Sequence, residues 1–166
     1  MTKWLFAAAL MLMVFPCSGT AQSKASLVGT WRLVSFTSTN DKGEVENAYG
    51  PNPTGFLTYT ADGRVSVILA SSGRKPLSIP PTPAEETEAF STLTAYAGSY
   101  TFNGDKVIHH IEVCLVQNIV NTDQVRFVKL QGDRLIFRGG WLVNGVMYQP
   151  NNELVWERMR PKISDK

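Results

Sequence analysis

The sequence is poor in the residues from which disulfide frameworks and most metal sites are built. It holds two cysteines, Cys17 and Cys114, and two histidines, His109 and His110. Because we expect Cys17 to be removed with an N-terminal segment, Cys114 is left without a partner for an intramolecular disulfide. Its neighbours in sequence are apolar, so we expect Cys114 to be a small buried residue rather than a reactive thiol.

The two histidines stand side by side in VIHHIEV, residues 107–113, which has the composition of a β-strand. Side chains alternate along a strand, so His109 and His110 point in opposite directions and do not share a metal ion. The chain also lacks His-Glu-x-x-His, Cys-x-x-Cys and a glycine-rich phosphate loop. We therefore expect no metal and no cofactor; haem held through His109 alone is the remaining alternative.

An excess of charge of one sign is also lacking. The chain has 16 Lys and Arg against 14 Asp and Glu, and removal of residues 1–21, which include Lys3, leaves 15 against 14. Such a balance predicts no nucleic-acid partner and no electrostatic attachment to a membrane.

The long apolar run of the sequence is confined to the N-terminus. Lys3 precedes an apolar stretch over residues 4–15, and small residues follow up to Ala21, a pattern typical of a cleaved signal peptide. We expect cleavage after Ala21 and a periplasmic or secreted protein. An uncleaved membrane anchor is one alternative, and a lipid anchor on Cys17 is less favoured because Pro16 precedes it.

The remainder predicts one all-β domain over residues 26–160, followed by a tail at 161–166. Turn residues separate eight strand-like segments: 27–38, 56–60, 64–70, 99–102, 106–116, 124–130, 134–139 and 153–159. Their even spacing favours an eight-stranded antiparallel up-and-down β-barrel, with a β-sandwich as the alternative. Residues 40–55, rich in Asn, Gly and Pro, are expected to form a long loop.

One short helix is expected from Thr82 onward, after the strand-like segment at 64–70. Thr82 is suited to the N-cap, Pro83 to the first helical position and Glu85 to a capping box. Apolar side chains at helical spacing continue to Tyr96, and Gly98 is expected to end the helix. We expect about three turns that cap or flank the barrel.

Two short motifs connect the sequence to a known family. Gly29 and Trp31 in GTWRL resemble the Gly-x-Trp motif of the lipocalin superfamily, and LVWER near the C-terminus resembles its matching last strand. The resemblance implies that Trp31 lies near the closed end of the barrel and that Arg158 packs over it. LVGTWRLVSF, YGPNPTGFLTYTADGRVSV, VIHHIEV and DQVRFVKLQGDRLIF extend the likeness, between Leu27 and Arg158, to the bacterial and fungal lipocalin-like domain family.

The hairpin turns predict which side chains face inward. If Gly132-Asp133 is a two-residue loop, Leu130 faces Leu135, and Arg126 lies on the same apolar face. We expect this face to be the interior. The alternative is that Arg126 extends along the strand end to solvent.

The same reasoning at Asn103-Gly104 places Tyr100 opposite Val107 and on the face of His109. That face continues through Ile111, Val113 and Leu115, whereas the other face carries Ile108, His110, Glu112 and Cys114. The first face is more apolar, so we expect His109 to point inward, either to act as an acid or base or to hold a fixed hydrogen bond.

An interior with His109, Arg126 and Tyr100 among apolar side chains suits a small hydrophobic ligand that carries a polar group or a carboxylate. Further candidate ligand contacts are Tyr49, in the loop at 40–55, Tyr59 and Trp141. The loops at 40–55 and 70–82 are the candidates for a lid over the open end.

Three functions follow from this interior. The first is an exported barrel that binds a small hydrophobic molecule. The second is an isomerase or cyclase in which His109 is the acid or base and Arg126 stabilises negative charge. The third is a barrel filled by its own side chains, with a structural or interaction role. The binding role is favoured over the enzyme because no nucleophile motif is present; the sequence does not indicate an oligomeric state.

Overall fold

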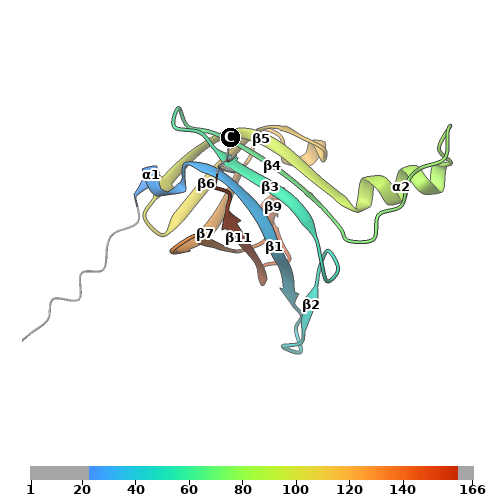
Figure 1. Cartoon of the computed structure of the whole chain (residues 1–166), viewed down its shortest axis with the longest axis horizontal. Coiled ribbons are helices and arrows are strands. Elements are labelled where there is room, and N and C mark those ends of the chain that lie inside the picture. Colours follow the sequence, from blue (N-terminus) through green and yellow to red (C-terminus); the bar gives the residue numbers. More distant parts are fainter. Residues whose placement is uncertain (1–22, 161–166) are drawn as a thin grey trace, which may run out of the picture.

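Eight antiparallel strands close into a barrel in the computed structural model, which describes residues 23–160 (Figure 1). The strands are β1 (Gly29–Thr39), β3 (Thr54–Tyr59), β4 (Arg64–Ala70), β5 (Leu93–Asn103), β6 (Lys106–Cys114), β7 (Asp123–Gln131), β8 (Arg134–Arg138) and β11 (Asn152–Arg158). Each pairs with the next in this order, and β11 pairs with β1. The predicted up-and-down barrel is confirmed and the β-sandwich alternative is wrong; the predicted signal peptide and tail fall outside the described residues.

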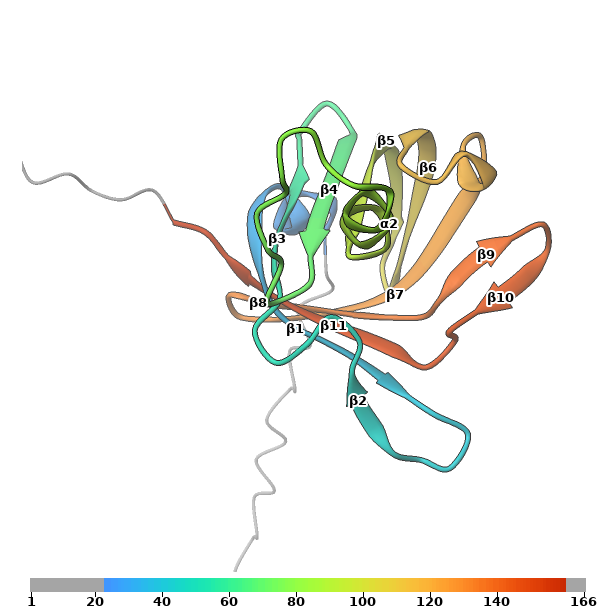
Figure 2. The same ribbon diagram turned by 90° about the vertical axis from the view of Figure 1, so that its right-hand side faces the viewer.

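Smaller elements surround the barrel (Figure 2). They are α1 (Lys24–Leu27), β2 (Val45–Asn47), α2 (Pro83–Ser91), the 3₁₀ helix η1 (Gln117–Ile119), β9 (Trp141–Val143) and β10 (Val146–Tyr148). β2 pairs with the end of β1, inside the stretch that we expected to be a loop, and β9 and β10 form a separate hairpin. No helix among the described residues has the length and apolarity to span a membrane.

The β7–β8 hairpin has the predicted register. Leu130 pairs with Leu135 across the Gly132-Asp133 turn, and Arg126 lies on the same face with 5% of its surface exposed. Arg126 therefore points into the barrel, and the alternative in which it reaches solvent is wrong.

The β5–β6 hairpin differs from its predicted register by two residues. Asn103 pairs with Lys106, so the tight turn is Gly104-Asp105, and Tyr100 lies opposite His109 rather than Val107. A shift of two residues keeps every side chain on its face. His109 and Tyr100 are thus both buried, as expected.

A β-bulge interrupts the same hairpin beyond Gly98. Ala97 pairs with Val113 and Gly98 with Ile111, which leaves Glu112 as the extra residue. A Cβ atom on Gly98 would lie 1.9 Å from the carbonyl oxygen of His110, so only glycine fits at this position.

The bulge reverses the two faces of the strand after Ile111. Val113, which we expected to point inward, is 62% exposed, and Leu115 is exposed as well. Cys114, which we expected on the outer face, packs partly buried against the core. Period-two alternation fails here because one inserted residue changes the parity of all that follow it.

The helix α2 begins as predicted and ends earlier. Thr82 is the N-cap, with Glu85 completing the capping box; hydrogen bonds from Ser78 and Thr82 lower the pKa of Glu85 to about 2. The helix stops at Ser91, and Tyr96 belongs to β5, because residues from Leu93 onward pair with β4. No residue of α2 is buried, and the helix projects from the barrel on an arm rather than covering it (Figure 1).

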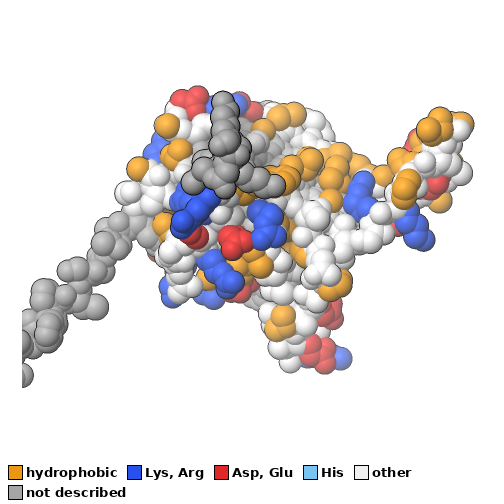
Figure 3. All heavy atoms as spheres, viewed as in Figure 1, with side chains coloured by type: hydrophobic (Ala, Val, Ile, Leu, Met, Phe, Trp, Pro, Cys, Tyr) orange, Lys and Arg blue, Asp and Glu red, His pale blue; other side chains and the backbone are white. Residues whose placement is uncertain are grey.

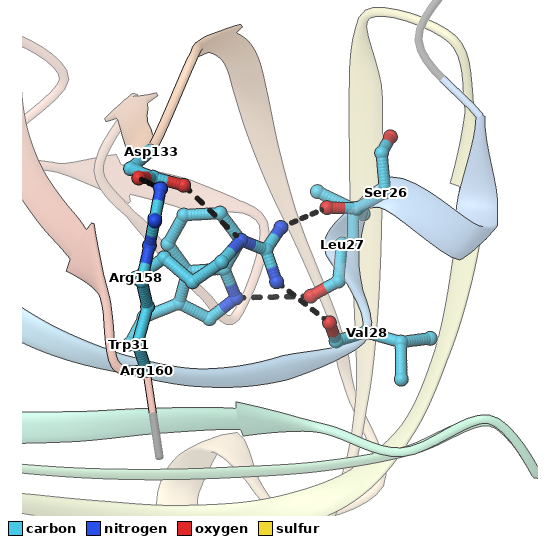
Figure 4. A network of polar contacts seen from close by, with 7 residues as sticks. All are labelled: Ser26, Leu27, Val28, Trp31, Asp133, Arg158 and Arg160. Carbon is cyan, nitrogen blue, oxygen red and sulfur yellow. Dashed lines mark hydrogen bonds and ion pairs between the residues drawn. The ribbon is translucent and has the colours of Figure 1, made fainter. Parts of the chain in front are cut away.

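A tryptophan and an arginine seal one end of the barrel (Figure 4). The Trp31 Nε1 donates to the Leu27 carbonyl oxygen at 2.9 Å, and the Arg158 guanidinium lies 4.0 Å from the centroid of the Trp31 ring. Arg158 also donates to the carbonyl oxygens of Val28 at 2.8 Å and Ser26 at 2.5 Å. The arrangement agrees with the one that the family resemblance implies.

Gly29 completes this seal through its backbone. Its φ is +132°, and a Cβ atom there would lie 2.9 Å from Nη1 of Arg158. A side chain at Gly29 would therefore be strained and would press on the arginine.

The outer surface carries charges of both signs close together (Figure 3). Cross-strand ion pairs join Arg32 to Glu157, Arg64 to Glu112 and Arg138 to Glu153. Exposed pairs of this kind are screened by solvent and add little to stability. The stability of the barrel therefore rests on its interior.

Candidate functional site

His109 lies fully buried at the centre of a hydrogen-bonded chain. Its Nε2 is 2.5 Å from the Tyr59 hydroxyl, and its Nδ1 is 2.9 Å from the Tyr96 hydroxyl. A neutral imidazole has one N–H donor and one acceptor nitrogen, so the two tyrosines satisfy both. Neither nitrogen is left to bind haem iron.

Burial keeps all three members of this chain uncharged. Desolvation, with a smaller contribution from the Arg126 charge, holds the pKa of His109 well below its usual value. Burial also raises the pKa of Tyr96 to about 12 and that of Tyr59 well above its usual value. His109 therefore remains neutral at physiological pH.

Arg126 is a buried cation whose charge meets no carboxylate among the described residues. Its Nη1 donates to the carbonyl oxygens of Val125 at 2.9 Å and Gly140 at 2.6 Å. Its guanidinium lies 4.6 Å from the centroid of the Trp141 ring, and burial lowers its pKa. Carbonyl dipoles and one aromatic face therefore replace a counter-ion.

A small interior pocket of about 20 Å³ lies beside Arg126. Its apolar walls include Phe36, Leu69, Phe137 and Trp141. Two more of its lining residues hold buried polar atoms that lack a partner among the residues described: Oδ1 of Asn152 and Nε1 of Trp156. Residues that carry an unpartnered acceptor, an unpartnered donor and a cation thus line one space.

A second, apolar pocket of about 220 Å³ also has Trp141 in its lining. Its walls come from the ends of β5 and β6, from η1 and from the β9–β10 hairpin, and include Ala95, Leu115, Ile119 and Tyr148. Trp141 lines both pockets, so the two meet at this residue.

Gln124 anchors the strand that carries this indole. The Gln124 amide donates to the Leu142 carbonyl oxygen at 2.8 Å, and the Leu142 N–H donates back to it at 2.9 Å. Thr122 accepts a further bond from Gln124 at 2.8 Å. The buried amide therefore fastens β9 to β7 next to Trp141.

Two of the predicted ligand contacts lie elsewhere. The Tyr100 hydroxyl donates to the Thr60 carbonyl oxygen at 3.1 Å, and its ring packs on Tyr59. The Tyr49 ring stacks on Phe36, 4.9 Å between centroids, and its hydroxyl bonds to Thr94. Neither tyrosine lines either pocket, whereas Arg126 lines the interior one and Trp141 lines both. His109 does not line them but contacts two residues of the interior pocket, Tyr96 and Phe137.

His110 faces outward, as expected, and links three strands. Its Nδ1 lies 2.6 Å from Oδ1 of Asp123 on β7, and its Nε2 lies 2.8 Å from the hydroxyl of Thr101 on β5. Asp123 and Thr101 are exposed and line neither of the two pockets beside Trp141. These hydrogen bonds are therefore surface contacts that support the sheet.

Four residues of the site escaped the sequence-based reasoning: Tyr96, Gln124, Asn152 and Trp156. Helical spacing predicts Tyr96 within the helix, whereas in the structure its strand begins two residues after α2 ends. Asn152 and Trp156 share a face of β11 with Arg158, so period-two alternation back from Arg158 was a signal for both.

The fold is a small closed antiparallel barrel, an architecture whose interior either is filled by side chains or holds one small ligand. The chain belongs to the lipocalin-like domain family, whose sequence profile matches residues 28–159. No match was found among curated proteins. Among the described residues, no three His, Cys, Asp or Glu side chains gather into a metal site.

Solved structures with a similar arrangement share little sequence with this chain. A lipocalin-like protein from Bacteroides uniformis is 15% identical, with a TM-score of 0.44, over 80% of this chain and 98% of its own. An uncharacterized protein from Bacteroides eggerthii is 10% identical, with a TM-score of 0.43, over 80% of this chain and 99% of its own.

Proposed function

We propose that the protein binds a small hydrophobic molecule through a carboxylate that pairs with Arg126. The observation that carries this proposal is the buried guanidinium, which no carboxylate of the described residues neutralises, on the wall of a pocket with two further unpaired polar atoms. Buried charges in folded proteins are normally paired, and a guanidinium matches a carboxylate with two parallel hydrogen bonds.

The size of the two pockets indicates how such a ligand is accommodated. The space of about 20 Å³ beside Arg126 holds about one water molecule, so the ligand's apolar body needs the adjoining pocket of about 220 Å³. Displacement of the Trp141 side chain, which lines both pockets, would join the two and give the head group more room than one water site. The head group then meets Arg126 while the body contacts the apolar residues between β5, β6 and β9.

The enzymatic alternative changes its residues in the light of this geometry. Tyr96 lines the pocket, whereas both nitrogens of His109 are bonded to tyrosines. Any proton transfer would run through the Tyr96 hydroxyl, with His109 holding it in position. The third possibility, a filled barrel, is favoured by one observation, the small volume of the interior pocket.

Isothermal titration calorimetry with 3-phenylpropionate and its uncharged amide tests the proposal. We expect the acid to bind and the amide to bind at least about tenfold more weakly, because only the acid neutralises Arg126. R126M should abolish this preference and remain folded, since Met replaces the volume and removes an uncompensated buried charge.

R138M is the matched control, because Arg138 is exposed and pairs with Glu153 on the outer surface. It should bind 3-phenylpropionate as the wild type does. Equal binding of acid and amide, or unchanged binding by R126M, would contradict the carboxylate site. No heat from either compound would favour the filled barrel.

Export belongs to the same proposal and is supported by the composition of residues 1–21. Mass spectrometry of the protein from its own host should give a chain that begins at Gln22. A chain that retains Lys3 and the apolar segment would contradict export with cleavage.

A further inference from the structure

Arg126 and Asn152 face the interior pocket from either side of a glycine. Gly139 follows β8, its N–H donates to the Asn152 carbonyl oxygen at 3.1 Å, and Gly140 beside it accepts from Arg126. Neighbouring strands lie about 5 Å apart, so the backbones of β7 and β11 are about 10 Å apart here. Because Gly139 has no side chain, the space between the guanidinium and the amide is left to the pocket that all three residues line.

The side-chain amide of Asn152 bonds through its nitrogen. Its Nδ2 donates to Oε1 of Gln149 at 3.3 Å, and this arrangement leaves Oδ1 directed elsewhere. The unpaired atom is therefore the oxygen, an acceptor, on a residue that is only 2% exposed. A buried acceptor without a donor is costly, so this position favours a donor, either a water molecule or a ligand hydroxyl that displaces it.

Trp156 adds a third requirement. Its Nε1 is an N–H donor without a partner among the described residues, on a side chain 1% exposed, and Trp156 shares a face of β11 with Asn152. A ligand that satisfies the whole pocket supplies negative charge to Arg126, an acceptor to Trp156 and a donor to Asn152.

From these requirements we infer that the ligand is a hydroxycarboxylic acid with an apolar body, a conclusion that rests on the proposed function and narrows it. The carboxylate pairs with Arg126, and the hydroxyl next to it donates to Oδ1 of Asn152. A remaining oxygen lone pair accepts from Nε1 of Trp156. The hydroxyl is both a donor and an acceptor, which suits a space bordered by one atom of each kind.

Other ligand classes leave one of these groups unsatisfied. A simple carboxylate gives Asn152 no donor, and a neutral alcohol leaves the Arg126 charge uncompensated. An amino acid supplies a donor, but its ammonium group would be repelled by the buried guanidinium. The hydroxycarboxylate alone among these meets all three demands.

A matched pair of probes tests the inference by calorimetry on the intact protein. 3-Phenyllactate and 3-phenylpropionate share their carboxylate and phenyl group and differ by one hydroxyl. We expect 3-phenyllactate to bind about tenfold more tightly, the effect of one buried hydrogen bond to an otherwise unpaired acceptor.

The Asn152→Leu variant removes the acceptor and keeps the size of the side chain. It should bring the two affinities within about twofold of each other, mainly by weakening 3-phenyllactate. N151L is the matched control, because Asn151 is exposed, and it should keep the wild-type ratio. A thermal melt of each variant establishes that it is folded. The ratio of the two affinities in the wild type tests the inference even if a variant does not fold.

The outcomes separate this inference from the proposed function. Equal binding of the two acids would overturn the hydroxyl requirement and leave carboxylate binding intact; a resident water would then satisfy Asn152. A preserved ratio in N152L would also overturn it. Failure of both acids to bind would overturn the proposed function and the inference with it.

Discussion

At the scale of single residues, the interior contains polar groups whose pairing is uneven. Each nitrogen of His109 has a tyrosine hydroxyl as its partner, so the imidazole is satisfied without a ligand. Arg126 relies on two carbonyl oxygens and one ring. His109 therefore supports the fold, whereas Arg126 is the residue to which we propose that the ligand carboxylate binds.

His109 gives the unfolding free energy a defined pH dependence. In the unfolded chain it titrates near pH 6.5, whereas burial keeps it neutral to much lower pH in the barrel. Below pH 6.5 the unfolded state binds a proton that the folded state does not, so stability falls by up to about 1.4 kcal/mol per pH unit. Above pH 6.5 this group contributes no slope.

Urea unfolding of the wild type and H109Q between about pH 7.5 and pH 5 tests this expectation. H109Q should be less stable at neutral pH, and its unfolding free energy should fall less steeply below pH 6.5 by the contribution of one proton. H110Q, on the outer face, is the control. Equal slopes for the wild type and H109Q would show that His109 is not the titrating group.

Hairpin geometry gave the orientation of the site's residues but not their partners. Alternation and a two-residue turn placed Arg126 and His109 inside, because a strand has only two faces. They did not reveal that Tyr96 and Tyr59 hydrogen-bond to His109, because the helical spacing predicted Tyr96 in a helix and because Tyr59 lies on β3, which does not pair with β6. The bulge at Glu112 was also beyond reach, because it depends on how closely Gly98 approaches its neighbour.

At the scale of elements, two of the three tight turns lie where the sequence predicted them, the turn after Asn103 is displaced by one residue, and the longer connections differ from their prediction. The Ala61-Asp62-Gly63 and Gly132-Asp133 turns lie where Gly and Asp indicated them. Residues 71–92 form an arm instead of a lid: α2 begins at its predicted cap but buries none of its side chains. Capping residues determine where a helix begins, whereas its packing depends on a surface that the cap does not encode.

We predict that the arm is dispensable for folding. Ala70 pairs with Leu93, the Ser71 N–H donates to the Thr92 carbonyl oxygen, and Ile79 is 100% exposed. Replacing residues 73–91 by Asn-Gly should change the unfolding free energy by less than about 1 kcal/mol, because a shorter loop closes at lower entropic cost. Denaturant unfolding measures this.

The β9–β10 hairpin provides the contrast. Replacing residues 142–148 by Asn-Gly removes the backbone that satisfies the buried Gln124 amide, so we expect a loss of at least about 1 kcal/mol. If the arm deletion were the more damaging of the two, the arm would have a role in the fold that its exposure does not indicate.

At the scale of the whole molecule, the barrel depends on the seam where the first and last strands meet. Trp31 pairs with Arg158 across this seam, and the indole is fully buried beneath the guanidinium. The resemblance of GTWRL and LVWER to a known family implied this contact, although the two motifs lie more than one hundred residues apart. Composition alone did not identify which strands close the barrel.

Trp31→Ala should destabilise the barrel by about 3–5 kcal/mol, the usual cost of truncating a buried aromatic residue. Trp141→Ala, at a partly exposed position outside the barrel strands, should cost clearly less. Thermal and urea unfolding of both variants measure the difference. Similar losses would mean that the seam is not the main determinant of stability.

The position of Trp141 where the two pockets meet has a consequence for how affinity should be interpreted. The indole already covers one face of the Arg126 guanidinium, so it competes with any incoming aromatic ring that would stack on that face. A measured dissociation constant is then the intrinsic constant divided by the fraction of molecules in which the indole has left that face. A modest measured affinity for an aromatic acid would thus be compatible with strong contacts in the complex. The protein would select ligands that both stack on the guanidinium in place of the indole and supply a carboxylate to it.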